Sequence, residues 1–84
     1  MPEKYMLYPM SVLELSYEMK KAVDDYKARR ISSAELQETV LAWANNAPDK
    51  FFDGADYKLT LKKVVGVRRM AVVTKMLDGY QTHI

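Results

Sequence analysis

The sequence predicts a small all-α domain: a bundle of three to four helices preceded by an extended N-terminal arm. Two serine-led capping motifs each precede apolar residues at helical spacing, and an apolar stretch near the C-terminus keeps that spacing. The chain has 84 residues, 49% of them hydrophobic, and no cysteine, so one core of packed helices must stabilise it. We expect a single domain over 1–84, with an arm at 1–10, a helical hairpin at 11–47 and a kinked C-terminal helix at 57–78.

The arm, MPEKYMLYPM, is expected to be extended because Pro9 fixes its own φ and disfavours helical geometry at Tyr8. It carries five large apolar residues, which favour packing on the helices over projection into water. These are Tyr5, Met6, Leu7, Tyr8 and Met10.

The first helix is expected to begin at Ser11, because Ser11 and Glu14 form a capping-box pattern. It should end near Arg29 and Arg30, where cations suit the negative end of the helix dipole. Its buried face is predicted from the i, i+4, i+7 spacing to contain Leu15, Met19, Ala22, Val23 and Tyr26.

The second helix is expected to begin after Ser32, because Ser32 and Glu35 repeat the capping box. The turn between the two helices is short, so they should form an antiparallel hairpin, with Ile31 closing its end. The predicted buried face contains Leu36, Val40, Trp43, Ala44 and Ala47, and the helix should stop at Asn45, Asn46 and Pro48.

Residues 48–56, PDKFFDGAD, are expected to form a loop anchored by Phe51 and Phe52. The fragment Asp-x-Gly-x-Asp invites a calcium interpretation, but the full twelve-residue ligand pattern with its terminal glutamate is missing. A turn in which an aspartate caps the following helix is the preferred interpretation.

The C-terminal stretch LKKVVGVRRMAVVTKML predicts one helix that is kinked or broken at Gly66 and stops at Asp78-Gly79. It is apolar nearly all round, which is typical of the central helix of a bundle. Helical spacing places Met70, Val73 and Leu77 on the buried side. Arg68 and Lys75 should form a narrow cationic stripe on the opposite side.

The net charge of +2 conceals a gradient along the chain. Residues 31–56 carry one cation and five anions, a net of −4, whereas residues 57–84 carry six cations and one anion, a net of +5. Such charge runs are often simply solvated faces. They can also bind nucleic-acid phosphates or an acidic partner, and the candidate residues are Lys58, Lys62, Lys63, Arg68, Arg69 and Lys75.

A helix-turn-helix around Gly66 is the specific form of the nucleic-acid hypothesis. Two observations weigh against sequence-specific reading. Lys62 stands where a small residue should let the two helices approach, and the second helix offers few polar side chains for base edges, because Thr74 should face the core. Sequence-independent phosphate contact stays open.

No catalytic constellation is apparent, so we expect no enzyme activity, no cofactor and no metal. The single histidine, His83, lies next to the C-terminus, and no cysteine or glycine-rich phosphate loop is present. Ser11 and Ser32 are explained as helix caps. Asp24 and Asp25 are neighbours in sequence, so on a helix they should point about 100° apart instead of sharing one site.

A protein-binding module is the remaining class. The chain has six tyrosines and six methionines, more than a thin core is expected to bury. Tyrosine is enriched at interface hot spots, and methionine supplies adaptable apolar surface. We expect a protein partner, with homodimerisation as a further option; tyrosines half-buried around the rim of a bundle are the alternative. The candidate interface residues are Tyr5, Tyr8, Tyr17, Tyr57 and Tyr80.

The order of these motifs resembles a family of short proteins from prophages and mobile elements of Gram-positive bacteria. The matching features are the capped first helix, AVDDYKARRISSAEL leading into the second, the later FFDG segment and GVRRMAVVTKML; together they cover most of residues 11–78. The family has no assigned activity, so the resemblance transfers no catalytic or binding residue. Val67 stands where the family prefers a cation, which weakens the case for phosphate binding by this face.

The resemblance implies a phage or mobile-element setting, in which small proteins often act stoichiometrically by binding DNA or by blocking a host defence or replication protein. We expect the protein to be cytoplasmic, since the sequence shows no cysteine, no signal-peptide pattern and no apolar run of about 18 residues. The expected function is therefore non-enzymatic binding to a macromolecular partner, such as inhibition of a host protein. Nucleic-acid binding through the basic C-terminal third is the alternative.

Overall fold

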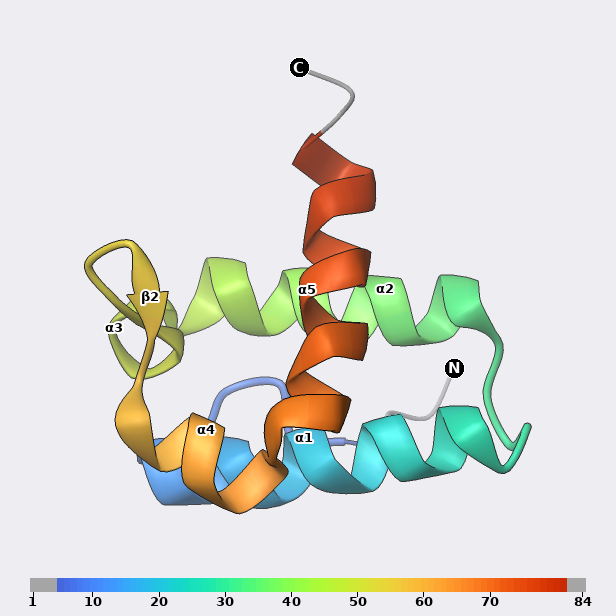
Figure 1. Ribbon diagram of the computed structural model, residues 1–84, viewed down its shortest axis with the longest axis horizontal. Coiled ribbons are helices and arrows are strands. Elements are labelled where there is room, and N and C mark those ends of the chain that lie inside the picture. The colour runs from blue at the N-terminus through green and yellow to red at the C-terminus, as the bar shows by residue number, and fades with distance from the viewer. Residues whose placement is uncertain (1–4, 82–84) are drawn as a thin grey trace.

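The computed structural model describes residues 5–81, and the side chains of residues 5–78 within that range. Helices dominate it, which confirms the predicted all-α fold class. The elements are α1 (Val12–Lys27), α2 (Ser33–Asn46), α3 (Pro48–Phe51), β1 (Phe52–Asp53), β2 (Asp56–Tyr57), α4 (Leu59–Val65) and α5 (Val67–Gln81). The helices α1 and α2 run antiparallel and pack on each other, α4 packs along α1, and α5 stands across them (Figure 1).

Both predicted helix starts are confirmed. The Ser11 hydroxyl accepts a hydrogen bond from the Glu14 N–H at 3.1 Å. The Glu14 carboxylate, however, accepts from the N–H of Met10 and so holds the arm instead of completing the box. At α2 the box is complete, because Glu35 accepts from the Ser32 N–H while Ser32 accepts from the Glu35 N–H.

The first helix ends at Lys27, before the predicted arginines. Ala28 caps it, and Arg29 takes a left-handed conformation with φ 63°. Such a residue turns the chain out of a helix and is usually glycine or asparagine, so arginine here gives no sequence signal. Ile31 is buried beyond it and closes the hairpin, as predicted.

Residues 48–57 contain more structure than the predicted loop. Pro48 begins the one-turn helix α3, a position where its missing N–H is not needed. The strands β1 and β2 then pair antiparallel, Phe52 opposite Tyr57, around Gly54 at φ 63°. Phe51 is fully buried, as predicted.

The predicted aspartate cap is wrong. Lys58 is the N-cap of α4 and makes no side-chain capping bond. The carboxylate of Asp56 instead accepts from the Tyr57 N–H at 2.7 Å and from Lys62 Nζ at 2.6 Å.

Gly66 separates two helices instead of kinking one. Its φ of 92° and ψ of 157° lie in a region that is essentially restricted to glycine. The predicted stop at Asp78-Gly79 is also wrong, because α5 continues to Gln81. A single glycine costs a helix only about 1 kcal/mol relative to alanine, so the pattern marks a permitted end and not an obligatory one.

The core lies among all five helices. Met70, Val73 and Leu77 are buried, which confirms the predicted inner face of α5. The prediction that α5 is the central helix is wrong, because Val67 is 84% exposed and the C-terminal end of α5 extends past α2 (Figure 1). The fully buried side chains with the largest volume are Trp43, Phe51, Leu15, Met19, Leu36, Leu61, Val23, Val40, Val65, Val73 and Ser16.

The arm packs on α1 and α2, as predicted for this segment as a whole. Its backbone is held by side chains: Met6 N–H donates to Glu18 at 3.0 Å, and the Met6 carbonyl accepts from Trp43 Nε1 at 2.7 Å. The Leu7 carbonyl accepts from Asn46 Nδ2 at 3.0 Å. Every one of these bonds is to a helix side chain, so the arm is fixed without forming a strand.

Candidate functional site

The six predicted basic residues do not form one free cationic surface. Lys62 is bonded to Asp56, and Arg69 is bonded to Asp24. Lys58 is half-buried. Lys63, Arg68 and Lys75 are exposed and form no ion pair with the described residues. The exposure of Arg68 and Lys75 confirms the predicted cationic stripe on α5.

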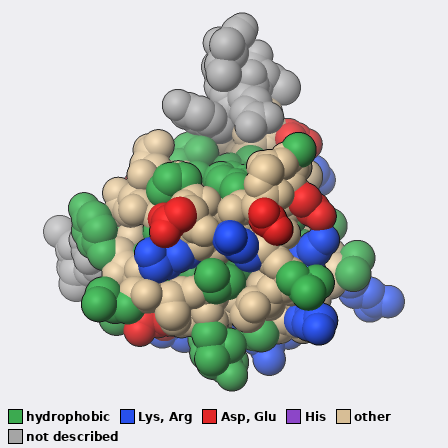
Figure 2. All heavy atoms as spheres, turned by 90° about the vertical axis from the view of Figure 1, so that its left-hand side faces the viewer, with side chains coloured by type: hydrophobic (Ala, Val, Ile, Leu, Met, Phe, Trp, Pro, Cys, Tyr) green, Lys and Arg blue, Asp and Glu red, His purple; other side chains and the backbone are tan. Residues whose placement is uncertain are grey.

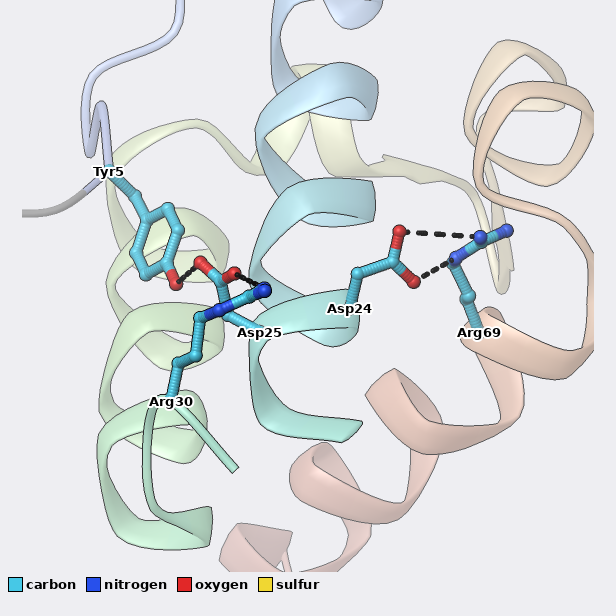
Figure 3. Close-up of polar contacts among 5 residues, drawn as sticks. All are labelled: Tyr5, Asp24, Asp25, Arg30 and Arg69. Atoms are coloured by element: carbon cyan, nitrogen blue, oxygen red, sulfur yellow. Dashed lines mark hydrogen bonds and ion pairs between the residues drawn. The ribbon is translucent and has the colours of Figure 1, made fainter. Parts of the chain in front are cut away.

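Arg69 joins three helices through its guanidinium, and Figure 3 shows its two bonds to Asp24 of α1. Its Nε donates to Asp24 Oδ1 at 2.8 Å, and its Nη2 donates to Asp24 Oδ2 at 3.3 Å. Its Nη1 donates to the Val65 carbonyl at 3.1 Å, which satisfies an orphan acceptor at the end of α4. The sequence places Arg69 among the partner-binding cations, whereas the structure gives it an intramolecular role.

The surroundings of Asp24 are strongly cationic. The hydrogen bond from Arg69 lowers the pKa of Asp24, and the charges of Arg69, Lys20 and Lys27 lower it further against the opposing effect of desolvation. Sequence reasoning missed Lys20 and Lys27 as members of a basic site. Lys20 lies four residues before Asp24 and Lys27 three residues after it. This spacing in the sequence already places the three side chains on one face of the helix.

Asp24 and Asp25 point to different sides of α1, as predicted from their adjacency (Figure 3). Asp25 accepts from the Tyr5 hydroxyl at 2.6 Å and from Arg30 Nη1 at 3.1 Å. Burial, together with the hydrogen bond to Asp25, raises the pKa of Tyr5 well above its ordinary value.

The side chains of two predicted interface tyrosines pack and form hydrogen bonds within the fold. Tyr5 is 7% exposed and lies edge-on to Trp43, so the assignment of Tyr5 to a protein interface is corrected. Tyr57 is half-buried; its ring stacks with Phe52, and its hydroxyl shares a 2.7 Å hydrogen bond with Thr74. That bond also confirms that Thr74 faces inward. The Tyr80 side chain lies outside the described residues.

The other two, Tyr8 and Tyr17, are exposed at 71% and 58%. They belong to a set of exposed large hydrophobic side chains in the arm and the first two turns of α1, which we call the apolar surface. Figure 2 views the molecule from the end where α1 begins and shows hydrophobic side chains at the surface among acidic and basic ones. The apolar surface consists of Met6, Tyr8, Met10, Leu13 and Tyr17.

The fold positions this surface firmly. Leu13 and Tyr17 are one turn apart on α1, and Met10 directly precedes the cap residue Ser11. Glu14 and Glu18, on an adjacent face of the same helix, bind the arm backbone at Met10 and Met6. The apolar side chains are therefore displayed on a rigid element and on an arm that is fixed to it.

Within the described part of the chain, no three His, Cys, Asp or Glu side chains gather where they could hold a metal ion. None of the helices seen there has the length and apolar character needed to span a lipid bilayer.

Comparison with known proteins identifies a family, but it returns no curated protein and no solved structure. A family model described as "Conserved hypothetical protein" matches residues 6–78, which include the whole apolar surface and the Asp24–Arg69 pair. The chain thus belongs to this family of conserved hypothetical proteins, CLB_0814_fam.

Proposed function

We propose that the chain is a small non-enzymatic binding protein that associates stoichiometrically with a protein partner. The apolar surface carries this proposal. In the part of the chain that the structure describes, five of the seven exposed large hydrophobic side chains lie within residues 6–17. Single exposed apolar residues are normal, but a concentration of them is typical of an interaction site.

The composition of the surface fits this role. Tyr8 and Tyr17 combine a large contact area with a polar tip, and Met6 and Met10 adapt to the shape of a partner. Aromatic residues and methionine are the types that interfaces favour over the rest of a protein surface. Their display on a helix and a fixed arm reduces the entropy that is lost on binding.

The biological setting in this proposal rests on the sequence resemblance to proteins of Gram-positive prophages and mobile elements. In such a setting the partner is a host defence or replication protein, and binding inhibits it in the cytoplasm. A second copy of the chain is another protein that the same surface could bind, and the test below distinguishes it.

Nucleic-acid binding is the second candidate, and the exposed cations Lys63, Arg68 and Lys75 favour it. It is weaker than the sequence suggests, since Lys62 and Arg69 already pair with carboxylates within the chain. Phosphate binding predicts an affinity that falls between about 50 and 200 mM salt, and the fall is less steep with three cations than with the six that the sequence suggests.

Affinity capture from a host lysate, with and without nuclease, tests the proposal. We expect a protein that is retained after nuclease treatment and lost with the double variant Leu13→Ser, Tyr17→Ser. Leu59→Ser is the matched control, because Leu59 is 60% exposed on α4 and does not belong to the apolar surface. Loss of all captured protein on nuclease treatment would favour nucleic-acid binding, and a complex that contains only this chain would indicate a homodimer.

A further inference from the structure

We propose that the protein partner presents an acidic segment with apolar side chains, and that this segment lies along the outward stripe of α1 and ends beside Arg68. This inference deepens the proposed function and rests on it. We define the outward stripe by its residues: Leu13, Tyr17, Lys20, Asp24 and Lys27.

The stripe is one continuous face of the helix. At 3.6 residues per turn, its five positions fall within about 80° of one another. Leu13, Tyr17 and Lys27 are exposed, whereas Lys20 and Asp24 are half-buried at the edge of the stripe nearer the core. From Leu13 to Lys27 the stripe is about 21 Å long, which corresponds to about six residues of an extended segment.

The two halves of the stripe differ in chemistry. The N-terminal half is apolar, with Leu13 at 48% and Tyr17 at 58% exposure. The C-terminal half is cationic: Lys20 and Lys27 flank Asp24, whose carboxylate is already bonded to Arg69 of α5.

The cationic half carries a surplus of positive charge. Arg68 is exposed next to Arg69 in the first turn of α5. Lys20, Lys27 and Arg68 form no salt bridge with the side chains that the structure describes. Lys20 and Lys27 are therefore available beside the one carboxylate that Arg69 neutralises, and Arg68 adds an exposed cation at the start of α5. Carboxylates of a partner are complementary to these cations.

The apolar half favours a protein segment over a nucleic acid. Leu13 is aliphatic and offers no face for base stacking, so Tyr17 is the single aromatic ring in this half and does not form a stacking platform. A duplex presents one phosphate charge about every 1.7 Å. Along α1 that charge density would also meet the carboxylates of Glu14 and Glu18 beside the apolar residues. An acidic peptide segment can place apolar side chains against the apolar half and carboxylates against the cationic half.

The test uses defined probes with the full chain. A labelled copolymer of glutamate and tyrosine, a labelled polyglutamate and a labelled duplex DNA are each titrated with the protein, and fluorescence anisotropy reports binding. We expect the copolymer to bind about tenfold more tightly than polyglutamate, because only the copolymer offers aromatic groups to the apolar half. Binding of the duplex in preference to both polypeptides would overturn the inference.

Four variants assign the binding to the stripe. Leu13→Ser with Tyr17→Ser should reduce copolymer affinity to that of polyglutamate, and Lys20→Gln with Lys27→Gln should weaken both polypeptides by about tenfold. The controls Leu59→Ser and Lys75→Gln replace an exposed apolar residue and an exposed cation outside the stripe, and should change neither affinity more than about twofold. An equal loss with Lys75→Gln would mean unspecific charge attraction and would overturn the inference.

The lysate capture separates this inference from the function on which it depends. If the partner is lost with Leu13→Ser, Tyr17→Ser but retained at full level with Lys20→Gln, Lys27→Gln, the chain binds a protein whose segment is not acidic. If the first pair of substitutions also leaves capture unchanged, the proposed function itself fails.

Discussion

Arg69 and Asp24, 45 residues apart in the chain, form a forked ion pair that holds the start of α5 against α1. The same guanidinium donates to the Val65 carbonyl, where α4 ends before Gly66. One side chain therefore fixes both the position of α5, through the pair drawn in Figure 3, and the corner between α4 and α5. The pair is partly exposed, with side-chain accessibilities of 32% for Arg69 and 45% for Asp24, so solvent screens it.

The stability contribution of this pair should be modest and measurable. We expect Arg69→Gln and Asp24→Asn each to lower the free energy of unfolding by about 0.5–1 kcal/mol, with a coupling energy of similar size in the double-mutant cycle. Urea denaturation followed by circular dichroism measures it. Strictly additive effects would show that the two side chains do not interact in solution.

The same pair predicts a pH dependence. Because Arg69 lowers the pKa of Asp24 below its ordinary value of 3.8, the pair stabilises the fold fully above that value. The stabilisation is lost as pH falls through the lower pKa of the folded state. The stability difference between the wild type and Asp24→Asn should therefore be present near neutral pH and vanish in strong acid. A difference that grows as the pH falls would contradict this.

Of the two glycines whose surroundings the structure describes, Gly66 should be the less tolerant of substitution. Gly66→Ala should lower stability by about 1–3 kcal/mol, because its backbone conformation is open almost only to glycine. Crowding contributes little, since a Cβ there would meet only Arg69 Nη1 at 4.0 Å. Gly54→Ala is the matched control. Gly54 has φ 63° and open space around it, so Gly54→Ala should lower the stability by about 1–2 kcal/mol or less. Equal effects at the two sites in thermal unfolding would refute the distinction.

The arm is predicted to depend on Trp43. Trp43→Phe removes the donor to the Met6 carbonyl and leaves a void, so it should lower stability by about 2–3 kcal/mol. Asn46→Ala removes an exposed bond to the Leu7 carbonyl and should cost less than about 1 kcal/mol. Limited proteolysis should then cut the arm of Trp43→Phe first. An arm that stays protected in this variant would show that its bonds to Glu14, Glu18 and Asn46 hold it without the indole donor.

Arg68 and Lys75 should be nearly neutral for stability. Both are exposed on α5, so Arg68→Ala combined with Lys75→Ala is expected to change the free energy of unfolding by less than about 1 kcal/mol. A larger loss in urea denaturation would place the two side chains in packing contacts that the structure does not contain.

Local chemistry made much of the fold predictable. The caps at Ser11 and Ser32, the buried faces of α1 and α2 and the inner face of α5 all follow from short-range spacing, and each is confirmed. The two helix ends that differ from the predicted positions have a common cause. The end of α1 at Lys27 depends on an arginine in a left-handed conformation, and the extent of α5 depends on a glycine that a helix tolerates. Neither the left-handed arginine nor the tolerated glycine can be recognised from the residues next to it in the sequence.

The candidate site was less predictable because its residues are partnered over long distances. The pairing of Arg69 with Asp24, and of Tyr5 with Asp25, joins segments that sequence spacing cannot relate. Exposure of Tyr8 and burial of Tyr5 likewise depend on how the arm lies on α1 and α2. Lys20 and Lys27 could have been found, because their helical spacing around Asp24 is visible in the sequence.

The most direct test of the central claim is a map of backbone amide chemical-shift changes, recorded on isotope-labelled protein titrated with the partner recovered by lysate capture. The account predicts that the largest changes follow α1 from Leu13 to Lys27 and include Arg68. Changes concentrated on Lys63, Arg68 and Lys75, with Leu13 and Tyr17 unaffected and the same pattern produced by duplex DNA, would contradict it.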